Sequence, residues 1–76
     1  MKFEELVNLE RDKQDQKWGE QNHFPLRWLG ILMEEVGETA TECINNNPSH
    51  NLGHEIVQVA AVAKAMYESL ERNGWL

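Results

Sequence analysis

Two turn-forming segments divide this sequence into three stretches, and each stretch has the composition and spacing of a helix. The first segment covers residues 19–25, and the second is the run Asn-Asn-Asn-Pro-Ser at residues 45–49. Asn, Gly and Pro favour non-helical backbone, so both segments are typical of turns. The sequence has no runs that alternate apolar and polar residues as strands do. The pattern therefore predicts an all-α protein with three helices.

The expected helices span residues 3–16, 25–44 and 49–72, with residue 51 as the alternative start of the third. Residues 18–24 form the expected first loop. Pro25 suits a first helical turn, where its missing N–H would be unpaired anyway, and Gly74 is a plausible C-terminal stop. The expected apolar residues of the first helix are Phe3, Leu6, Val7 and Leu9. Those of the second recur at steps of three and four residues: Leu26, Leu29, Met33, Val36, Ala40 and Cys43 or Ile44.

The length of the chain predicts a single domain, residues 1–76, that needs help to be stable. A core of this size rarely leaves more than about 3–5 kcal/mol of net stability, and the lone Cys43 excludes an internal disulfide. Residues 56–63 are apolar almost all the way round, which requires cover on more than one side. We therefore expect a short helical bundle completed by oligomerisation, as a homodimer or as a homotetramer built as a dimer of dimers.

The charge of the chain excludes several classes of function. Seven Lys and Arg residues stand against thirteen Asp and Glu residues, a net charge of −6, and no basic run is present. Nucleic-acid binding by phosphate neutralisation is therefore not expected.

No stretch of about 18 apolar residues exists, and the first residues lack the features of a signal peptide. The expectation is a cytoplasmic protein that does not cross a membrane.

Acidic residues at helical spacing are the strongest candidates for chemistry. Glu35 and Glu38 are one turn apart on the second expected helix, with Glu34 beside them, and Glu55 and Gln58 have the same spacing on the third. Two antiparallel helices joined by a short turn would point these side chains at one another. Such a group of oxygen ligands suits Mg²⁺ or Mn²⁺.

The alternative is that these glutamates form a solvated helix face, as most glutamates on helices do. Apolar neighbours argue against it. The face that carries Glu35 and Glu38 continues through Ile31 and Trp28, and the face that carries Glu55 and Gln58 continues through Val62 and Met66. Carboxylates next to apolar side chains on both helices are expected to be partly buried, which is unfavourable unless cations or protons neutralise them.

The pattern Glu34-Glu35-x-x-Glu38 followed by Glu55-x-x-Gln58 resembles the EExxE…ExxD signature of the MazG-like nucleoside triphosphate pyrophosphohydrolases. The resemblance extends upstream through Trp18-Gly19-x-Gln21-x-His23 and downstream through residues 59–63, and it covers roughly residues 14–72. It implies a helical dimer or dimer of dimers that uses Mg²⁺ to cleave a nucleoside triphosphate into a monophosphate and pyrophosphate. By matching position it implies metal ligands at Glu35, Glu38 and Glu55, with Glu34 as a ligand, a supporting group or the residue that orients the attacking water. A role in clearing unwanted deoxynucleotides is a further expectation.

One position departs from the family pattern. Gln58 stands where the family has Asp, and an amide oxygen coordinates a hard cation without supplying charge. Gln58 is expected either to complete the metal site or to hydrogen-bond a phosphate or a water. The departure keeps open an alternative function, a helical interaction or regulatory module with weakened or lost catalysis. A di-iron carboxylate bundle is not expected, because that class carries a Glu-x-x-His motif on each of two helices and none of the three expected helices carries one.

Aromatic and cationic residues near the acidic helix are the candidates for substrate binding. Trp18, Gln21 and His23 combine a stacking surface with groups that can read the polar edge of a base. Trp18 is equally consistent with a core position, His23 with a cap of the second helix, and Trp28 is expected in the core. His50 and His54 are expected as a surface pair. The candidate phosphate contacts are Lys17, Arg27, Lys64 and Arg72, although Lys64 is equally consistent with a solvated side chain.

Overall fold

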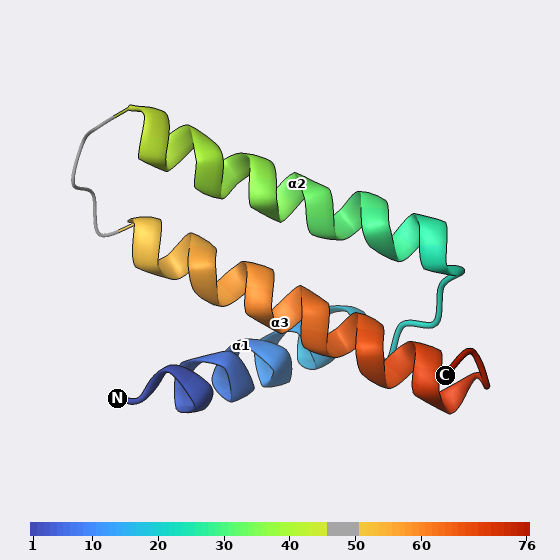
Figure 1. The fold of residues 1–76 in the computed structure, drawn as a ribbon. Coiled ribbons are helices and arrows are strands. Elements are labelled where there is room, and N and C mark those ends of the chain that lie inside the picture. The colour runs from blue at the N-terminus through green and yellow to red at the C-terminus, as the bar shows by residue number, and fades with distance from the viewer. Residues whose placement is uncertain (46–50) are drawn as a thin grey trace.

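The computed structural model describes residues 1–45 and 51–76, and this part of the chain is entirely helical apart from its turns. Helix α1 spans Phe3–Trp18, α2 spans Pro25–Ile44 and α3 spans Asn51–Arg72. Figure 1 shows α2 and α3 running side by side in opposite directions, with α1 on the other side of α3. The prediction of an all-α, three-helix fold is confirmed for the described residues.

Helix α3 is the centre of the bundle. It contacts α2 along one side and α1 along another, whereas α1 and α2 make no close backbone contact with each other within the described ranges. Ala61, Val62 and Ala65 in the middle of α3 are buried between these two helices. The neighbouring helices therefore cover the apolar run at residues 56–63 more fully than we expected, although Ile56 and Ala63 stay exposed.

The start of α2 and the end of α3 follow local sequence rules, as predicted. Pro25 is the first residue of α2. Gly74 has φ 79°, and Trp75 N–H donates to the Leu70 carbonyl (2.8 Å) while Gly74 N–H donates to the Glu71 carbonyl (3.2 Å). This is the Schellman arrangement that ends a helix at glycine. The start of α3 at Asn51 matches one predicted boundary. Residues 46–50, which include all but the first residue of the expected second turn, lie outside the described residues.

Helix α1 continues past its predicted end. It was expected to stop at residue 16 with Trp18 in the loop, but Trp18 is the last residue of the helix. Gly19 ends it, since its φ of 73° lies in the left-handed region that glycine adopts without strain, and its N–H donates to the Asp15 carbonyl (2.8 Å). The connecting segment is therefore residues 19–24, and Trp18 is held by a helix.

The core lies between the amino-terminal half of α2 and the carboxy-terminal half of α3. Trp28, which is 2% exposed, packs with Val62, Ala65 and Leu70, and Ile31, Leu32 and Met66 border the group. The Trp28 indole Nε1–H donates to the hydroxyl oxygen of Ser69 (3.1 Å), which is itself fully buried. The predicted core position of Trp28 is confirmed, and its one polar atom is satisfied.

The apolar stripe predicted for α2 is on the outside of this chain. Leu26 is 79% exposed, and Leu29, Met33, Val36, Ala40, Cys43 and Ile44 are exposed as well. The side of α2 that faces α3 is a second apolar stripe, centred on Trp28, Ile31 and Leu32. In α1 only Val7 of the four expected apolar residues is buried. The longer apolar stripe found by spacing is therefore the outer face of α2, and α3 covers the face of Trp28 and Ile31 that the sequence showed next to Glu35 and Glu38.

No helix in the described ranges combines the length and the apolar character that crossing a membrane requires.

Candidate metal and nucleotide site

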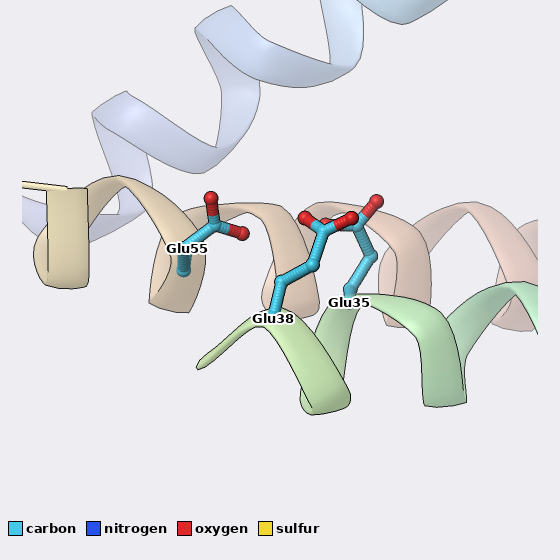
Figure 2. A group of neighbouring side chains, drawn as sticks. All are labelled: Glu35, Glu38 and Glu55. Atoms are coloured by element: carbon cyan, nitrogen blue, oxygen red, sulfur yellow. The ribbon is translucent and has the colours of Figure 1, made fainter. Parts of the chain in front are cut away.

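Three carboxylates meet where the middle of α2 lies against the amino-terminal part of α3. Glu35 and Glu38 come from α2 and Glu55 comes from α3, and one carboxylate oxygen of each lies within 4.8 Å of the others. Figure 2 shows the three side chains converging in the space between the helices. The sequence predicted this meeting from the spacing within each helix and from the antiparallel pairing of the helices. The structure brings the three residues together as expected.

The hydrophobic contact between α2 and α3 determines where these carboxylates point. Glu35 follows Trp28 by two helical turns, so its side chain projects from the face of α2 that packs against α3. Glu55 precedes the buried Val62 by two turns on α3. Burial of the apolar residues therefore turns both glutamates inward, and each is partly buried. Glu38 flanks them and is exposed.

The surroundings of the cluster disfavour its negative charge. The pKa of Glu35 is raised above 4.5, first by partial burial and then by the charges of Glu38 and Glu55. The pKa of Glu55 is also raised, by burial and by the hydrogen bond and charge of Glu38, while His54 lowers it. Oxygen Oε2 of Glu55 is buried and has no hydrogen-bond partner among residues 1–45 and 51–76. In the described part of the chain no lysine or arginine forms an ion pair with these three carboxylates.

A divalent cation fits these observations. Hard cations bind carboxylate oxygens, and the positive charge would offset the like-charge repulsion within the cluster. It would also supply a partner for the orphaned oxygen of Glu55, which the surrounding side chains do not. Glu35, Glu38 and Glu55 are the residues that would hold it.

Glu34 and Gln58 lie next to the cluster and have different surroundings. Glu34 is exposed and is not one of the three converging residues, although its charge contributes to the raised pKa of Glu35. Gln58 accepts a hydrogen bond at Oε1 from Nε2 of Gln14 (3.3 Å), and its Nε2 is 3.4 Å from Nε2 of His54. Its amide oxygen thus has a partner on α1. The ligand role of Gln58 stays a prediction.

A cavity of about 300 Å³ adjoins the cluster and is bounded by all three helices. One part of its wall is apolar and comes from the core, and another part is polar and includes Glu34, Glu35 and Gln58. The lining residues are Arg11, Gln14, Asp15, Trp18, Gly19, Gln21, Trp28, Ile31, Glu34, Glu35, Gln58, Val62, Ala65 and Arg72. The cavity thus joins an aromatic surface to one member of the acidic cluster, Glu35.

The predicted base-binding residues separate into two groups. Trp18 and Gln21 line the cavity, and Trp18 is 56% exposed, so the core position considered for Trp18 is wrong. His23 does not line it. The ring of His23 packs edge-on against Trp28 with 4.9 Å between centroids. A capping role for His23 finds no support either, since the cap residue of α2 is Phe24 and no side-chain hydrogen bond caps the helix.

The predicted phosphate-binding cations also differ in their position relative to the cavity. Lys17 places its ammonium 4.7 Å from the ring centroid of Trp18, which lines the cavity, although Lys17 itself does not line it. Arg27 lines shallow surface hollows elsewhere. The Lys64 ammonium donates to Oδ1 of Asn8 (2.7 Å) and joins α3 to α1, so in this chain it does not reach the cavity. Of the expected pair of surface histidines, His54 is exposed and His50 lies outside the described residues.

Arg72 lines the cavity and anchors the segment that leads into α2. Its guanidinium donates to the Gln21 carbonyl (3.1 Å) and to Oδ1 of Asn22 (2.9 Å), and it forms an ion pair with Glu20 (3.4 Å). Asn22 Oδ1 also accepts from Asn73 Nδ2 (2.8 Å). These contacts hold residues 20–22 against the end of α3, which places Gln21 at the cavity.

Sequence reasoning missed the contribution of α1 to the cavity. Arg11, Gln14 and Asp15 all line it. A signal was present, because Val7, Arg11, Gln14 and Trp18 recur at steps of three and four residues and share one face of the helix. Polar residues lie between Val7 and Trp18 on this face, so it does not form a continuous apolar stripe and was not predicted to face the other helices.

Comparisons of the chain with sequence models of protein families, with curated proteins and with solved structures gave no match.

Proposed function

We propose that this protein is a divalent-cation-dependent nucleoside triphosphate pyrophosphohydrolase of the MazG-like type. The observation that carries the proposal is the convergence of Glu35, Glu38 and Glu55 beside a cavity with Trp18 at its edge. The resemblance of the Glu34-Glu35-x-x-Glu38 and Glu55-x-x-Gln58 pattern to that family supports it. The reaction converts a nucleoside triphosphate, with deoxynucleotides as the expected class, into a monophosphate and pyrophosphate.

The proposed metal ligands are Glu35, Glu38 and Glu55. Mg²⁺, or Mn²⁺ in its place, neutralises negative charge on the phosphates and makes a water more acidic when it is bound at such a site. Glu34 lines the same cavity without joining the cluster, and this position suits the proposed role of holding the attacking water. Glu35 and Glu55 are kept partly out of solvent by the helix pairing, which strengthens their electrostatic interaction with a cation.

The proposed orientation of the substrate follows from the two parts of the cavity wall. The nucleobase stacks on Trp18 near the side-chain amide of Gln21, and the phosphates extend toward the carboxylates and their cations. Stacking on an exposed aromatic ring is worth about 1–3 kcal/mol per base. Lys17, beside the Trp18 ring, adds positive charge at that end.

Self-association belongs to the proposal because the single chain leaves the outer stripe of α2 uncovered. Leu26, Leu29, Met33 and Val36 form an exposed apolar row along this helix. Exposed contiguous apolar surface is typical of subunit interfaces. We propose that a second copy covers this row in a homodimer or a dimer of dimers. Light scattering on the purified chain is expected to give at least twice the monomer mass of 8.8 kDa, and a stable folded monomer would refute this part of the proposal.

A non-catalytic helical module is the second candidate function. The observation that favours it is the hydrogen bond from Gln14 to Gln58, which occupies the amide oxygen at the position where the family has a carboxylate. In that case the cluster would bind a cation weakly, and nucleotides would not be cleaved.

Incubation with a panel of ribo- and deoxynucleoside triphosphates and Mg²⁺ tests the two candidates, with products resolved by phosphorus NMR. Formation of monophosphate and pyrophosphate, lost when the metal is chelated, is the expected result. Intact triphosphates with both Mg²⁺ and Mn²⁺ would reject the enzyme and favour the module. The assay also identifies the preferred base and sugar.

A further inference from the structure

We propose that Arg11 of α1 binds the phosphate groups that enter the cavity, and in particular the pyrophosphate portion of a nucleotide. The class of ligand rests on the proposed function, but the assignment of an anion to this residue rests on geometry. Arg11 lines the same cavity as Glu34, Glu35 and Gln58, and it does so from the helix opposite the acidic one.

The guanidinium of Arg11 is held inside the protein with donors to spare. Its side chain is only 16% exposed. Nη1 donates to Oε1 of Gln14 (3.0 Å) and Nη2 donates to Oδ1 of Asp15 (3.1 Å), while Glu68 is farther away, at 3.9 Å from Nη2. Nε is buried and has no hydrogen-bond partner in the described structure. A guanidinium has five N–H donors in a fixed plane that matches phosphate oxygens, so this one retains capacity for an anion.

Two other candidate cations have partners of their own. Lys64 is bonded to Asn8 outside the cavity, and Arg72 is committed to the segment at residues 20–22. Carboxylates otherwise surround the polar end of the cavity, and a phosphate carries the same sign. Metal ions held by the glutamates would offset part of that repulsion, and Arg11 supplies a cation from the protein itself.

Arg11 is also positioned from both sides. Gln14 connects it to Gln58, since Gln14 accepts from Arg11 and donates to Gln58. The helical partner Asp15 holds the guanidinium from the other side. An anion that approaches Arg11 competes with the Asp15 carboxylate for it. Removal of the Asp15 charge should therefore strengthen anion binding, which would not follow if the ion pair were purely structural.

Calorimetric titration of the full chain with inorganic pyrophosphate in the presence of Mg²⁺ tests the proposal. Arg11→Gln is expected to weaken binding about 10- to 100-fold, because a charge-assisted contact is lost. Arg11→Lys retains the charge but not the planar group of donors, and is expected to fall between the wild type and Arg11→Gln. Asp15→Asn is expected to tighten binding, because it removes the competing carboxylate. Lys13→Gln, on the same helix but outside this cavity, is the matched loss of one positive charge and is expected to stay within about twofold of wild type.

The outcomes separate this proposal from the proposed function. If Arg11→Gln and Lys13→Gln bind pyrophosphate equally well, or if Arg11→Gln and Asp15→Asn both weaken it, Arg11 has only a structural role and the proposal is overturned. Absence of pyrophosphate binding by the wild type overturns it as well. If Arg11→Gln fails to fold, as judged by circular dichroism, the opposite shifts of Arg11→Lys and Asp15→Asn decide. A wild type that binds pyrophosphate through Arg11 but cleaves no triphosphate would reject the enzyme and retain this site.

Discussion

The two ends of the α2–α3 interface contrast in how well their polar groups are satisfied. At one end Trp28 is buried among Val62, Ala65 and Leu70, and its single donor is paired with Ser69. At the other end, two turns along α2, Glu35 and Glu38 face Glu55. The buried Oε2 oxygen of Glu55 has no hydrogen-bond partner in the described part of the chain. The same pair of helices builds both ends. The end at Trp28 therefore stabilises the helix pair, and this pairing holds the three carboxylates close together despite their like charges.

Such a division is typical of functional sites, where local rules of burial are broken and the rest of the fold compensates. The helices that carry Glu35, Glu38 and Glu55 are joined by the Trp28 core, so packing fixes the backbone positions from which the three carboxylates project. A cation that binds between them gains from an arrangement already made during folding.

Trp28→Ala is expected to have the largest effect, a loss of about 3–5 kcal/mol in the free energy of unfolding, because it leaves a cavity in the small core. Trp18→Ala is the matched control, since it removes the same side chain from an exposed position. Urea unfolding followed by circular dichroism measures both. A loss below about 1 kcal/mol for Trp28→Ala would contradict the assignment of the stabilising end.

Glu38→Gln is expected to abolish turnover and the stabilisation by Mg²⁺ while leaving the metal-free fold intact. Loss of a direct ligand should exceed the 10- to 100-fold effects seen when groups behind the ligands are changed. Thermal unfolding with and without Mg²⁺, together with the phosphorus NMR assay, measures both effects. Glu71→Gln, an exposed position at the far end of α3, is the control. Equal Mg²⁺ stabilisation of wild type and Glu38→Gln would rule out the proposed ligand set.

Ser69→Ala leaves the buried Trp28 indole N–H without its hydrogen-bond acceptor. The volume of the side chain at position 69 changes little. A loss of about 1–3 kcal/mol in the free energy of unfolding is expected, because a buried donor then lacks the hydrogen bond that offset its removal from water. Mg²⁺ binding should be unchanged. Stability equal to the wild type would show that the Trp28–Ser69 hydrogen bond does not define the satisfied end.

Gln58→Asp is expected to tighten Mg²⁺ binding by restoring a carboxylate at the position where the family pattern has one. The effect is expected to be smaller than that of Glu38→Gln, because the new carboxylate must exchange its contact with Gln14 for the cation. Calorimetric titration with Mg²⁺ measures the change. Equal or weaker affinity in the variant would count against a ligand role for this position.

The pH dependence of stability gives the smallest expected effect. The raised pKa values of Glu35 and Glu55 mean that the folded protein retains protons that the unfolded chain releases. Their protonation therefore stabilises the metal-free fold fully below the ordinary value of 4.5, and this contribution is lost as the pH rises through the raised values. Mg²⁺ should stabilise the protein more at pH 7 than at pH 5.

Thermal unfolding at both pH values, with Glu35→Gln as the comparison, tests this dependence. The variant lacks one of the two titrating groups, so its metal-free stability should fall less over the same range. A steeper fall in the variant than in the wild type would show that the cluster does not cause the pH dependence.

The sequence alone was sufficient for the parts of this protein that depend on neighbours along the chain. Pro25 and Gly74 act through their own backbone geometry, so the boundaries of α2 and α3 at these residues were predictable. Glu35 and Glu38 share a face because of the helical repeat, and the short connection to α3 requires an antiparallel return. Convergence with Glu55 followed from these two facts. The end of α1 was misplaced by two residues because a helix continues until a residue such as Gly19 stops it.

Which faces of the three helices pack against one another depended on the tertiary structure. Helix α2 has apolar residues on two faces, and the packing of Trp28 against α3 leaves Leu26 and Leu29 on the outside of this chain. Docking of α1 on α3 brings Arg11 and Gln14 to the cavity, and the mostly polar face that carries them has no strong periodic signal. Local spacing determines which residues share a helix face, whereas the choice between faces depends on packing among residues distant in sequence. For this reason the carboxylates were found from the sequence and Arg11 was not.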